Sequence, residues 1–149
     1  MIHTPIRLEY TYAPGLAASR FLRGLAAGRV LGQRCPRCAK VYVPPRGSCP
    51  MCGVLTSTEV EVGPRGTVTT YCVVNVPSPH LPIPVPYACA EVLLDGADIA
   101  TTFLLREVEP DAVRIGMRVE TVWADERGPT LASISHVRPV DEPDAAYES

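Results

Sequence analysis

The chain has 149 residues and a formal net charge of −2, so it has the size of one ordinary domain and lacks a strongly basic balance. No stretch approaches the roughly 18 apolar residues of a membrane helix, and the first twenty residues lack the basic start and apolar run of a secretory signal. We therefore expect a cytoplasmic protein, in which the six cysteines are metal ligands or reduced thiols.

Residues 1–32 are expected to form an extended segment followed by a short helix. Three apolar residues alternate with polar ones near the start: Leu8, Tyr10 and Tyr12. After the Pro14-Gly15 break, four larger apolar residues recur with approximately helical spacing: Leu16, Phe21, Leu22 and Leu25. This pattern predicts a helix from about Leu16 to Ala27, with Gly28 as its stop.

Residues 33–62 contain two Cys-x-x-Cys pairs that predict a metal site. Cys35 and Cys38 form the first pair, and Cys49 and Cys52 form the second. Four thiolates can close a tetrahedron around Zn²⁺ and leave no open position, so we expect a structural zinc that replaces the core this short ribbon lacks. The same sulfurs would also hold iron, and free cysteines or a single redox pair are the alternatives without metal.

Residues 63–140 carry five runs rich in β-branched and aromatic residues: Gly66–Val76, Tyr87–Leu94, Asp98–Leu105, Arg118–Asp125 and Thr130–Arg138. Turn signals between the second and third runs and between the fourth and fifth predict two antiparallel hairpins. Five strands in this length predict a Greek-key barrel of the OB type, whereas an immunoglobulin-like sandwich usually needs about seven. Residues 141–149 are acidic and are expected to form a solvated, disordered tail.

No catalytic residues are recognisable in the sequence. The three histidines, at positions 3, 80 and 136, fit no triad or metal spacing, and there is no phosphate-binding glycine loop. Cys72 and Cys89 fall on predicted strands among apolar neighbours, so we expect both to be reduced and buried in the core. We therefore expect no enzymatic turnover from the chain on its own.

Two features of the surface admit more than one interpretation. Residues 13–58 contain seven basic residues and no acid, which fits a solvated face, a site for the phosphates of a nucleotide-bearing ligand, or a nucleic-acid-binding surface. The lack of paired aromatic residues on the predicted strands weakens the last of these. The loop Pro77–Pro86 contains five prolines and is either a rigid connection or a preordered arm that binds a partner.

The order of these motifs resembles a known family. The matching segments, in chain order, are Phe21–Leu25, Cys-Pro-Arg-Cys, Val43–Arg46, Cys-Pro-Met-Cys-Gly, Gly66–Tyr71, Pro86–Ala88 and Val113–Val119. Together they resemble the acyl-CoA-associated family that has a rubredoxin-like zinc ribbon and a C-terminal OB fold, long described as a domain of unknown function. The resemblance covers about residues 15–138.

The resemblance implies a small, non-catalytic partner or scaffold subunit of a thiolase-superfamily enzyme, which would be a thiolase, an acyltransferase or a steroid side-chain aldolase. In such a hetero-oligomer the partner supplies the catalytic residues, and a CoA thioester binds at the interface. No residue of this chain is assigned to CoA. The alternative function is a zinc-ribbon and OB-fold module that binds nucleic acid.

We expect the partner interface to use the helix, the ribbon and the proline loop. The short helix carries more apolar surface than the small ribbon can cover, and the loop presents apolar residues in a stiff, extended form. The expected interface residues are Phe21, Leu22, Leu25, Tyr42, Leu81, Ile83 and Val85.

Overall fold

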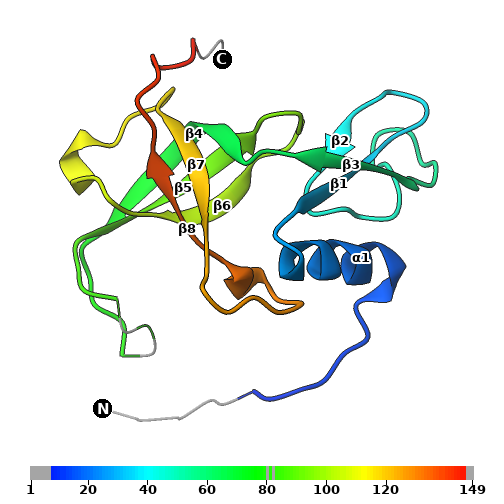
Figure 1. Ribbon diagram of the computed structural model, residues 1–149, viewed down its shortest axis with the longest axis horizontal. Coiled ribbons are helices and arrows are strands. Elements are labelled where there is room, and N and C mark those ends of the chain that lie inside the picture. The colour runs from blue at the N-terminus through cyan, green and yellow to red at the C-terminus, as the bar shows by residue number, and fades with distance from the viewer. Residues whose placement is uncertain (1–7, 80, 82, 147–149) are drawn as a thin grey trace, which may run out of the picture.

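A helix precedes a three-stranded sheet and a closed five-stranded barrel in the computed structural model, which describes residues 8–79, 81 and 83–146 (Figure 1). The helix is α1 (Gly15–Ala26), and the small sheet contains β1 (Val30–Arg34), β2 (Val41–Tyr42) and β3 (Thr58–Val62). The barrel strands are β4 (Arg65–Val74), β5 (Tyr87–Leu94), β6 (Thr101–Leu105), β7 (Arg118–Trp123) and β8 (Ile134–Pro139). The predicted mainly β fold, with a helix, a ribbon and an OB barrel, is confirmed.

The end of α1 follows from Gly28, which adopts a left-handed φ of 74°. The Gly28 N–H donates to the Leu25 carbonyl at 3.0 Å, and the Arg29 N–H donates to the Gly24 carbonyl at 2.9 Å. This pair of bonds is the Schellman motif, in which glycine satisfies the last helix carbonyls without a Cβ penalty. Within the described residues, no helix is long and apolar enough to cross a membrane.

The ribbon sheet has the order β2-β1-β3, with both pairs antiparallel. β1 pairs with β3 along its whole length, from Val30 opposite Val62 to Arg34 opposite Thr58. β1 therefore begins at Val30, whereas the sequence predicts that the ribbon starts at residue 33.

The barrel has the strand order β4-β5-β6-β8-β7 and closes where β7 pairs with β4. β5 with β6 and β7 with β8 form the two antiparallel hairpins that the turn signals predict. The segment Leu131–Ser133 is a 3₁₀ turn, η2, so the last predicted strand begins later than expected, at Ile134. Another 3₁₀ turn, η1 (Pro110–Ala112), precedes β7.

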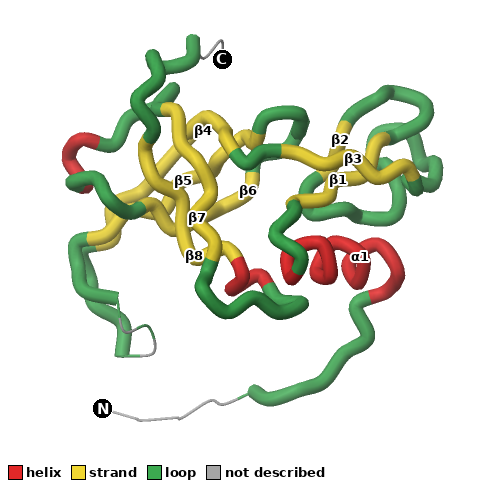
Figure 2. Tube along the Cα trace, in the orientation of Figure 1, coloured by secondary structure: helices red, strands yellow, loops and turns green. Residues whose placement is uncertain are grey.

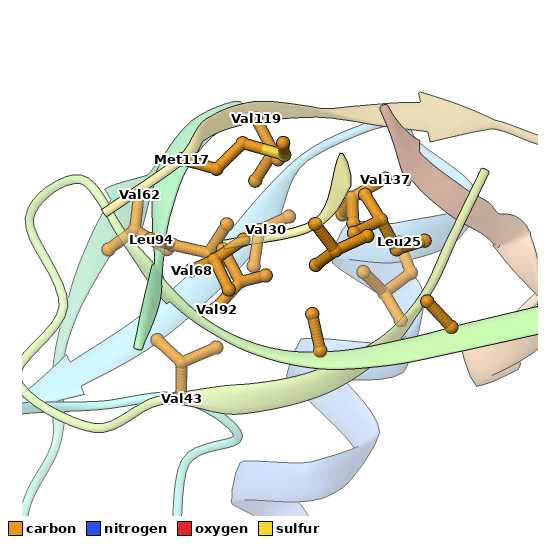
Figure 3. Packing of buried hydrophobic residues seen from close by; sticks show 14 of the residues in the cluster. Leu25, Val30, Val43, Val62, Val68, Val92, Leu94, Met117, Val119 and Val137 are labelled. Carbon is orange, nitrogen blue, oxygen red and sulfur yellow. The ribbon is translucent and has the colours of Figure 1, made fainter. Parts of the chain in front are cut away.

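The hydrophobic core runs without a break from α1 through the ribbon into the barrel (Figure 3). Phe21 and Leu25 of α1 are only 5% and 0% exposed, and Val43 of the ribbon joins the same cluster. The cluster includes four fully buried barrel valines: Val68, Val92, Val119 and Val137. α1 packs against β1 of the ribbon and against η2 in the β7–β8 connection, so this chain itself covers the apolar side of the helix.

The described part of the acidic tail lies against the barrel. Glu142 pairs with Arg118 at 3.0 Å, and Asp144 pairs with Arg114 at 2.5 Å. The Ala145 N–H donates to the Gly116 carbonyl at 2.8 Å. The expectation of a solvated, disordered tail is therefore wrong for residues 141–146, because arginines of the barrel supply partners for its acids; residues 147–149 lie outside the described part.

Candidate metal centre

The two cysteine pairs lie on equivalent turns of the ribbon, in the loops that Figure 2 shows before and after β2. The Cys35 N–H donates to the Lys40 carbonyl at 2.9 Å. In the second turn the Cys49 N–H donates to the Val54 carbonyl at 2.8 Å, across the same number of residues. Each Cys-x-x-Cys segment is thus closed by its own backbone bonds.

Both turns also require a left-handed residue at the same position. Ala39 has a φ of 62° and its N–H donates to the Cys35 carbonyl at 3.0 Å. Gly53 has a φ of 68° and its N–H donates to the Cys49 carbonyl at 2.9 Å. Glycine adopts this conformation freely, whereas alanine does so at a cost of about 1 kcal/mol or more.

The turns bring the four predicted ligands together. The Sγ atoms of all four cysteines lie within 4.8 Å of one another. The Sγ atoms of Cys38 and Cys49, one from each turn, are 3.7 Å apart. A tetrahedron with Zn–S bonds of about 2.3 Å has edges of about 3.8 Å, so this donor set fits Zn²⁺.

Hydrogen bonds stabilise negative charge on the sulfurs, as metal ligation requires. The backbone N–H groups of Arg37 and Cys38 each donate to Cys35 Sγ at 3.4 Å. The Tyr42 hydroxyl donates to Cys49 Sγ at 3.2 Å, which lowers the pKa of Cys49 to about 6 and raises the pKa of Tyr42 to about 12. Burial raises the pKa of Cys52 to about 12, so that thiol depends most on a positive ion to lose its proton.

The four-cysteine cluster is buried on one side and exposed to solvent on the other. Cys35 and Cys49 are each 1% exposed and pack with Tyr42 in a small cluster of their own. Ile99, from the connection between β5 and β6, packs against this cluster, whereas Cys38 is exposed. The barrel therefore covers the inner side of the candidate metal centre.

Two barrel residues that sequence reasoning missed join the ribbon to the barrel. The Asp98 carboxylate accepts a 2.8 Å bond from the Val41 N–H, and the Asp98 N–H donates to the Val41 carbonyl at 2.9 Å. The Thr101 hydroxyl donates to the Val43 carbonyl at 2.9 Å. In the sequence Asp98 is sufficiently explained by the neighbouring turn, and nothing local indicates a contact with residues so distant in the chain.

The expected interface residues fall into two groups. Phe21, Leu25 and Tyr42 are 5%, 0% and 2% exposed, so predicting them as partner-binding residues was wrong: they belong to this chain's own core. Leu22 is half-buried and packs against that core. The proline-loop residues remain accessible, with Leu81 exposed and both Ile83 and Val85 half-buried.

The prediction that Cys72 and Cys89 are buried was also wrong. Cys72 is exposed and Cys89 is half-buried, because both lie on the outer face of the barrel. Of the histidines, only His136 is described: its ring lies 3.1 Å from Ser135 Oγ and 3.1 Å from Glu107. Arg138 also forms an ion pair with Glu107, so Glu107 connects His136 and Arg138 on the barrel.

Comparison with known proteins identifies both parts of the chain. The ChsH2 rubredoxin-like zinc ribbon domain matches residues 23–56, and the ChsH2 C-terminal OB-fold domain matches residues 59–124. A DUF35 domain-containing scaffold protein of Methanocaldococcus jannaschii is 38% identical over 63% of this chain and 67% of its own length. A probable enoyl-CoA hydratase alpha subunit of Thermomonospora curvata is 35% identical over 65% of this chain, but the chain covers only 30% of that longer protein.

Two solved structures have the same fold. An Ltp2-ChsH2(DUF35) aldolase contains a chain with a TM-score of 0.66 and 27% identity, and the match covers 87% of this chain and 98% of that one. A DUF35 protein of unknown function from Sulfolobus solfataricus has a TM-score of 0.64 at 18% identity, covering 84% of each chain.

Proposed function

We propose that this chain is a scaffold subunit of a thiolase-like acyl-CoA enzyme, because it belongs to the ChsH2 family of proteins with a zinc ribbon and a C-terminal OB-fold domain. The partner subunit supplies the catalytic residues for thiolysis, acyl transfer or retro-aldol cleavage. A CoA thioester binds where the two subunits meet. The chain contributes the surface that positions the partner.

The similarity to the aldolase chain carries this proposal. It extends over 98% of that chain and includes both ribbon and barrel, so the whole architecture is shared and not one motif. Three relatives bear the name scaffold protein, including one of Pyrococcus furiosus that is 31% identical and is covered over 68% of its length. These names support a role in assembling other subunits.

We propose that Cys35, Cys38, Cys49 and Cys52 hold one structural zinc ion. Their Sγ separations support tetrahedral ligation, and a site filled by four thiolates leaves no position for substrate. The ion joins the two turns, the Tyr42 hydroxyl of β2 bonds to Cys49, and the neighbouring Val41 of β2 bonds to Asp98. Its role is therefore to stabilise the ribbon against the barrel.

Measurement of the zinc content of purified protein and of two variants tests the zinc proposal. Freshly purified protein should contain one zinc per chain, and Cys49→Ser should lose the metal together with ribbon structure. Thr70→Ser, on the barrel, should keep full zinc content. Equal zinc loss from both variants, or folded wild-type protein without any metal, would contradict the proposal.

We propose that the proline loop, residues 77–86, contributes to the partner interface. Leu81 is 43% exposed, and Ile83 and Val85 are half-buried without belonging to the core cluster. Exposed apolar side chains on a stiff segment lose little entropy on binding. The described residues of this loop extend the β4–β5 hairpin beyond the barrel body (Figure 1).

Co-expression with a thiolase-superfamily protein from the same host tests the function. The two chains should co-elute as a hetero-oligomer of defined mass. Acyl-CoA cleavage or acyl transfer should require the complex, with no turnover from the purified chain alone. Turnover by the chain alone would refute the scaffold role, and salt-sensitive retention on single-stranded DNA without partner binding would favour the nucleic-acid alternative.

A further inference from the structure

Two cysteines face each other across neighbouring strands on the outside of the barrel. Cys72 of β4 and Cys89 of β5 are direct partners in the antiparallel ladder, so their side chains point to the same side of the sheet. The pair Thr70 and Glu91 shares this face, and both of these residues are exposed. The pair is separate from the metal centre, whose thiol cluster contains only ribbon cysteines.

The register places the two cysteines within disulfide range. Directly opposed residues of an antiparallel pair have Cα atoms about 4.5 or 5.5 Å apart, depending on the hydrogen-bonding position. A disulfide accepts Cα separations of about 4.4–6.8 Å. Both positions therefore allow Cys72 and Cys89 to bond without a change of register.

The two thiols differ in how readily reagents reach them. Cys72 is exposed, whereas Cys89 is half-buried. Burial raises the pKa of Cys89, and the nearby Cys72 raises it further when charged. Both thiols line an open hollow on the barrel surface that also includes Glu91 and Thr102, so a small reagent can enter. A reagent in this hollow meets Cys72 as the more accessible sulfur.

We propose that Cys72 and Cys89 form a reversible redox site that closes to a cross-strand disulfide when the protein meets a peroxide. Cys72 thiolate attacks one peroxide oxygen and becomes a sulfenic acid, while the O–O bond breaks and the other oxygen leaves as water after protonation. Cys89 thiolate then attacks the Cys72 sulfur, the S–S bond forms, and the sulfenic oxygen leaves as a second water. Together the two thiols lose two electrons, and one molecule of hydrogen peroxide is reduced to two waters.

A disulfide between Cys72 and Cys89 would cross-link the two strands of the β4–β5 hairpin. Cys72 lies close to the end of β4 at Val74, and Cys89 lies close to the start of β5 at Tyr87. A disulfide there ties the base of the proline loop, because residues 75–86 connect the two strands. The reduced site is restored by two molecules of a thiol such as glutathione: the first forms a mixed disulfide with one cysteine, and the second attacks that mixed disulfide, frees the cysteine and leaves as oxidised glutathione.

Peroxide treatment of the zinc-loaded, full-length chain tests the proposal. After oxidation, peptide mass mapping should recover Cys72 linked to Cys89, and the intact chain should lose the mass of two hydrogens. The zinc content should stay unchanged, and added glutathione should restore both thiols. A linkage between other cysteines, or zinc release as fast as thiol loss, would overturn the proposal.

Single substitutions distinguish the thiol that attacks the peroxide, Cys72, from the thiol that attacks the sulfenic acid, Cys89. Cys89→Ser should stop at the sulfenic acid, which dimedone labels at Cys72. Cys72→Ser should lose most dimedone labelling and form no disulfide within the chain. Equal labelling of both variants would overturn the assignment of Cys72 as the attacking thiol. Failure of wild-type protein to lose thiols, under conditions that oxidise a cysteine peptide, would overturn the site altogether.

Discussion

Ala39 and Gly53 show how a single position sets the geometry of the metal centre. They occupy equivalent places in the two turns, and both have left-handed φ values, of 62° and 68°. The sequence predicts the cysteine ligands from their spacing but gives no warning that Ala39 adopts a conformation that usually favours glycine. The fold imposes this conformation because the Ala39 N–H must reach the Cys35 carbonyl.

We predict opposite effects from exchanging these two residues. Gly53→Ala should lower the free energy of unfolding by about 1 kcal/mol, because alanine is strained at positive φ. Apart from Gly53 and its two chain neighbours, no heavy atom of the described residues lies within 4 Å of the position its Cβ would take, so the cost is one of backbone conformation. Ala39→Gly should be neutral or stabilising by up to about 1 kcal/mol, because strain relief opposes the added entropy of the unfolded chain. Chemical denaturation of zinc-loaded protein measures both changes.

Cys72 and Cys89 show why apolar neighbours in the sequence do not predict burial on a strand. Their apolar neighbours predict burial, but in a strand only alternate residues face the core. Ala88 and Ala90 take the inward positions on β5, at 2% and 1% exposed, and this places Cys89 on the outer face. Assigning inner and outer faces requires the strand register, which the short apolar run does not reveal.

At the scale of elements, local signals predict most of the fold. Apolar spacing and Gly28 place α1 to within a residue at each end, and turn signals predict both barrel hairpins. Contacts between elements are less predictable, because they join distant parts of the sequence. The bond between Asp98 and Val41 is an example, and it attaches the ribbon to the barrel.

We predict that Asp98→Ala weakens this attachment. Val41 is 2% exposed, so removal of the carboxylate leaves its N–H buried without that acceptor, at a cost of about 1–3 kcal/mol. Asp111→Ala is the control, because Asp111 is exposed on η1. Thermal melting should show a lower transition for Asp98→Ala alone, and hydrogen exchange should show faster exchange at Val41. Equal stability of the two variants would mean that the Asp98 bond contributes nothing.

At the scale of the whole molecule, the core joins α1, ribbon and barrel into one packed unit. Val30 and Val43, from the ribbon, lie in the same cluster as the barrel valines (Figure 3). The sequence indicates that the helix needs an apolar cover, but it cannot show whether that cover is this chain or a partner. The structure answers this for Phe21 and Leu25, which are buried, and among the expected interface residues leaves those of the proline loop accessible.

Because Phe21 lies in the core and Leu81 in the accessible proline loop, we predict different effects from substituting them. Phe21→Ala should lower the free energy of unfolding by about 3–5 kcal/mol, because it removes a buried aromatic ring from the shared core. Leu81→Ala should change stability by no more than about 0.5 kcal/mol, because Leu81 is 43% exposed. If the loop binds the partner, Leu81→Ala should instead weaken assembly, by on the order of 1 kcal/mol or more.

Denaturant unfolding and partner titration on both variants distinguish a core residue from an interface residue. Titration of Phe21→Ala is carried out below its melting temperature, so that affinity is measured on folded chains. The expected pattern is a large loss of stability with nearly unchanged affinity for Phe21→Ala, and the reverse for Leu81→Ala. Weakened assembly by folded Phe21→Ala, with Leu81→Ala unaffected, would mean that the partner docks on the helix after it moves away from the barrel. That result would return the interface to α1 and limit the proline loop to a connection between β4 and β5.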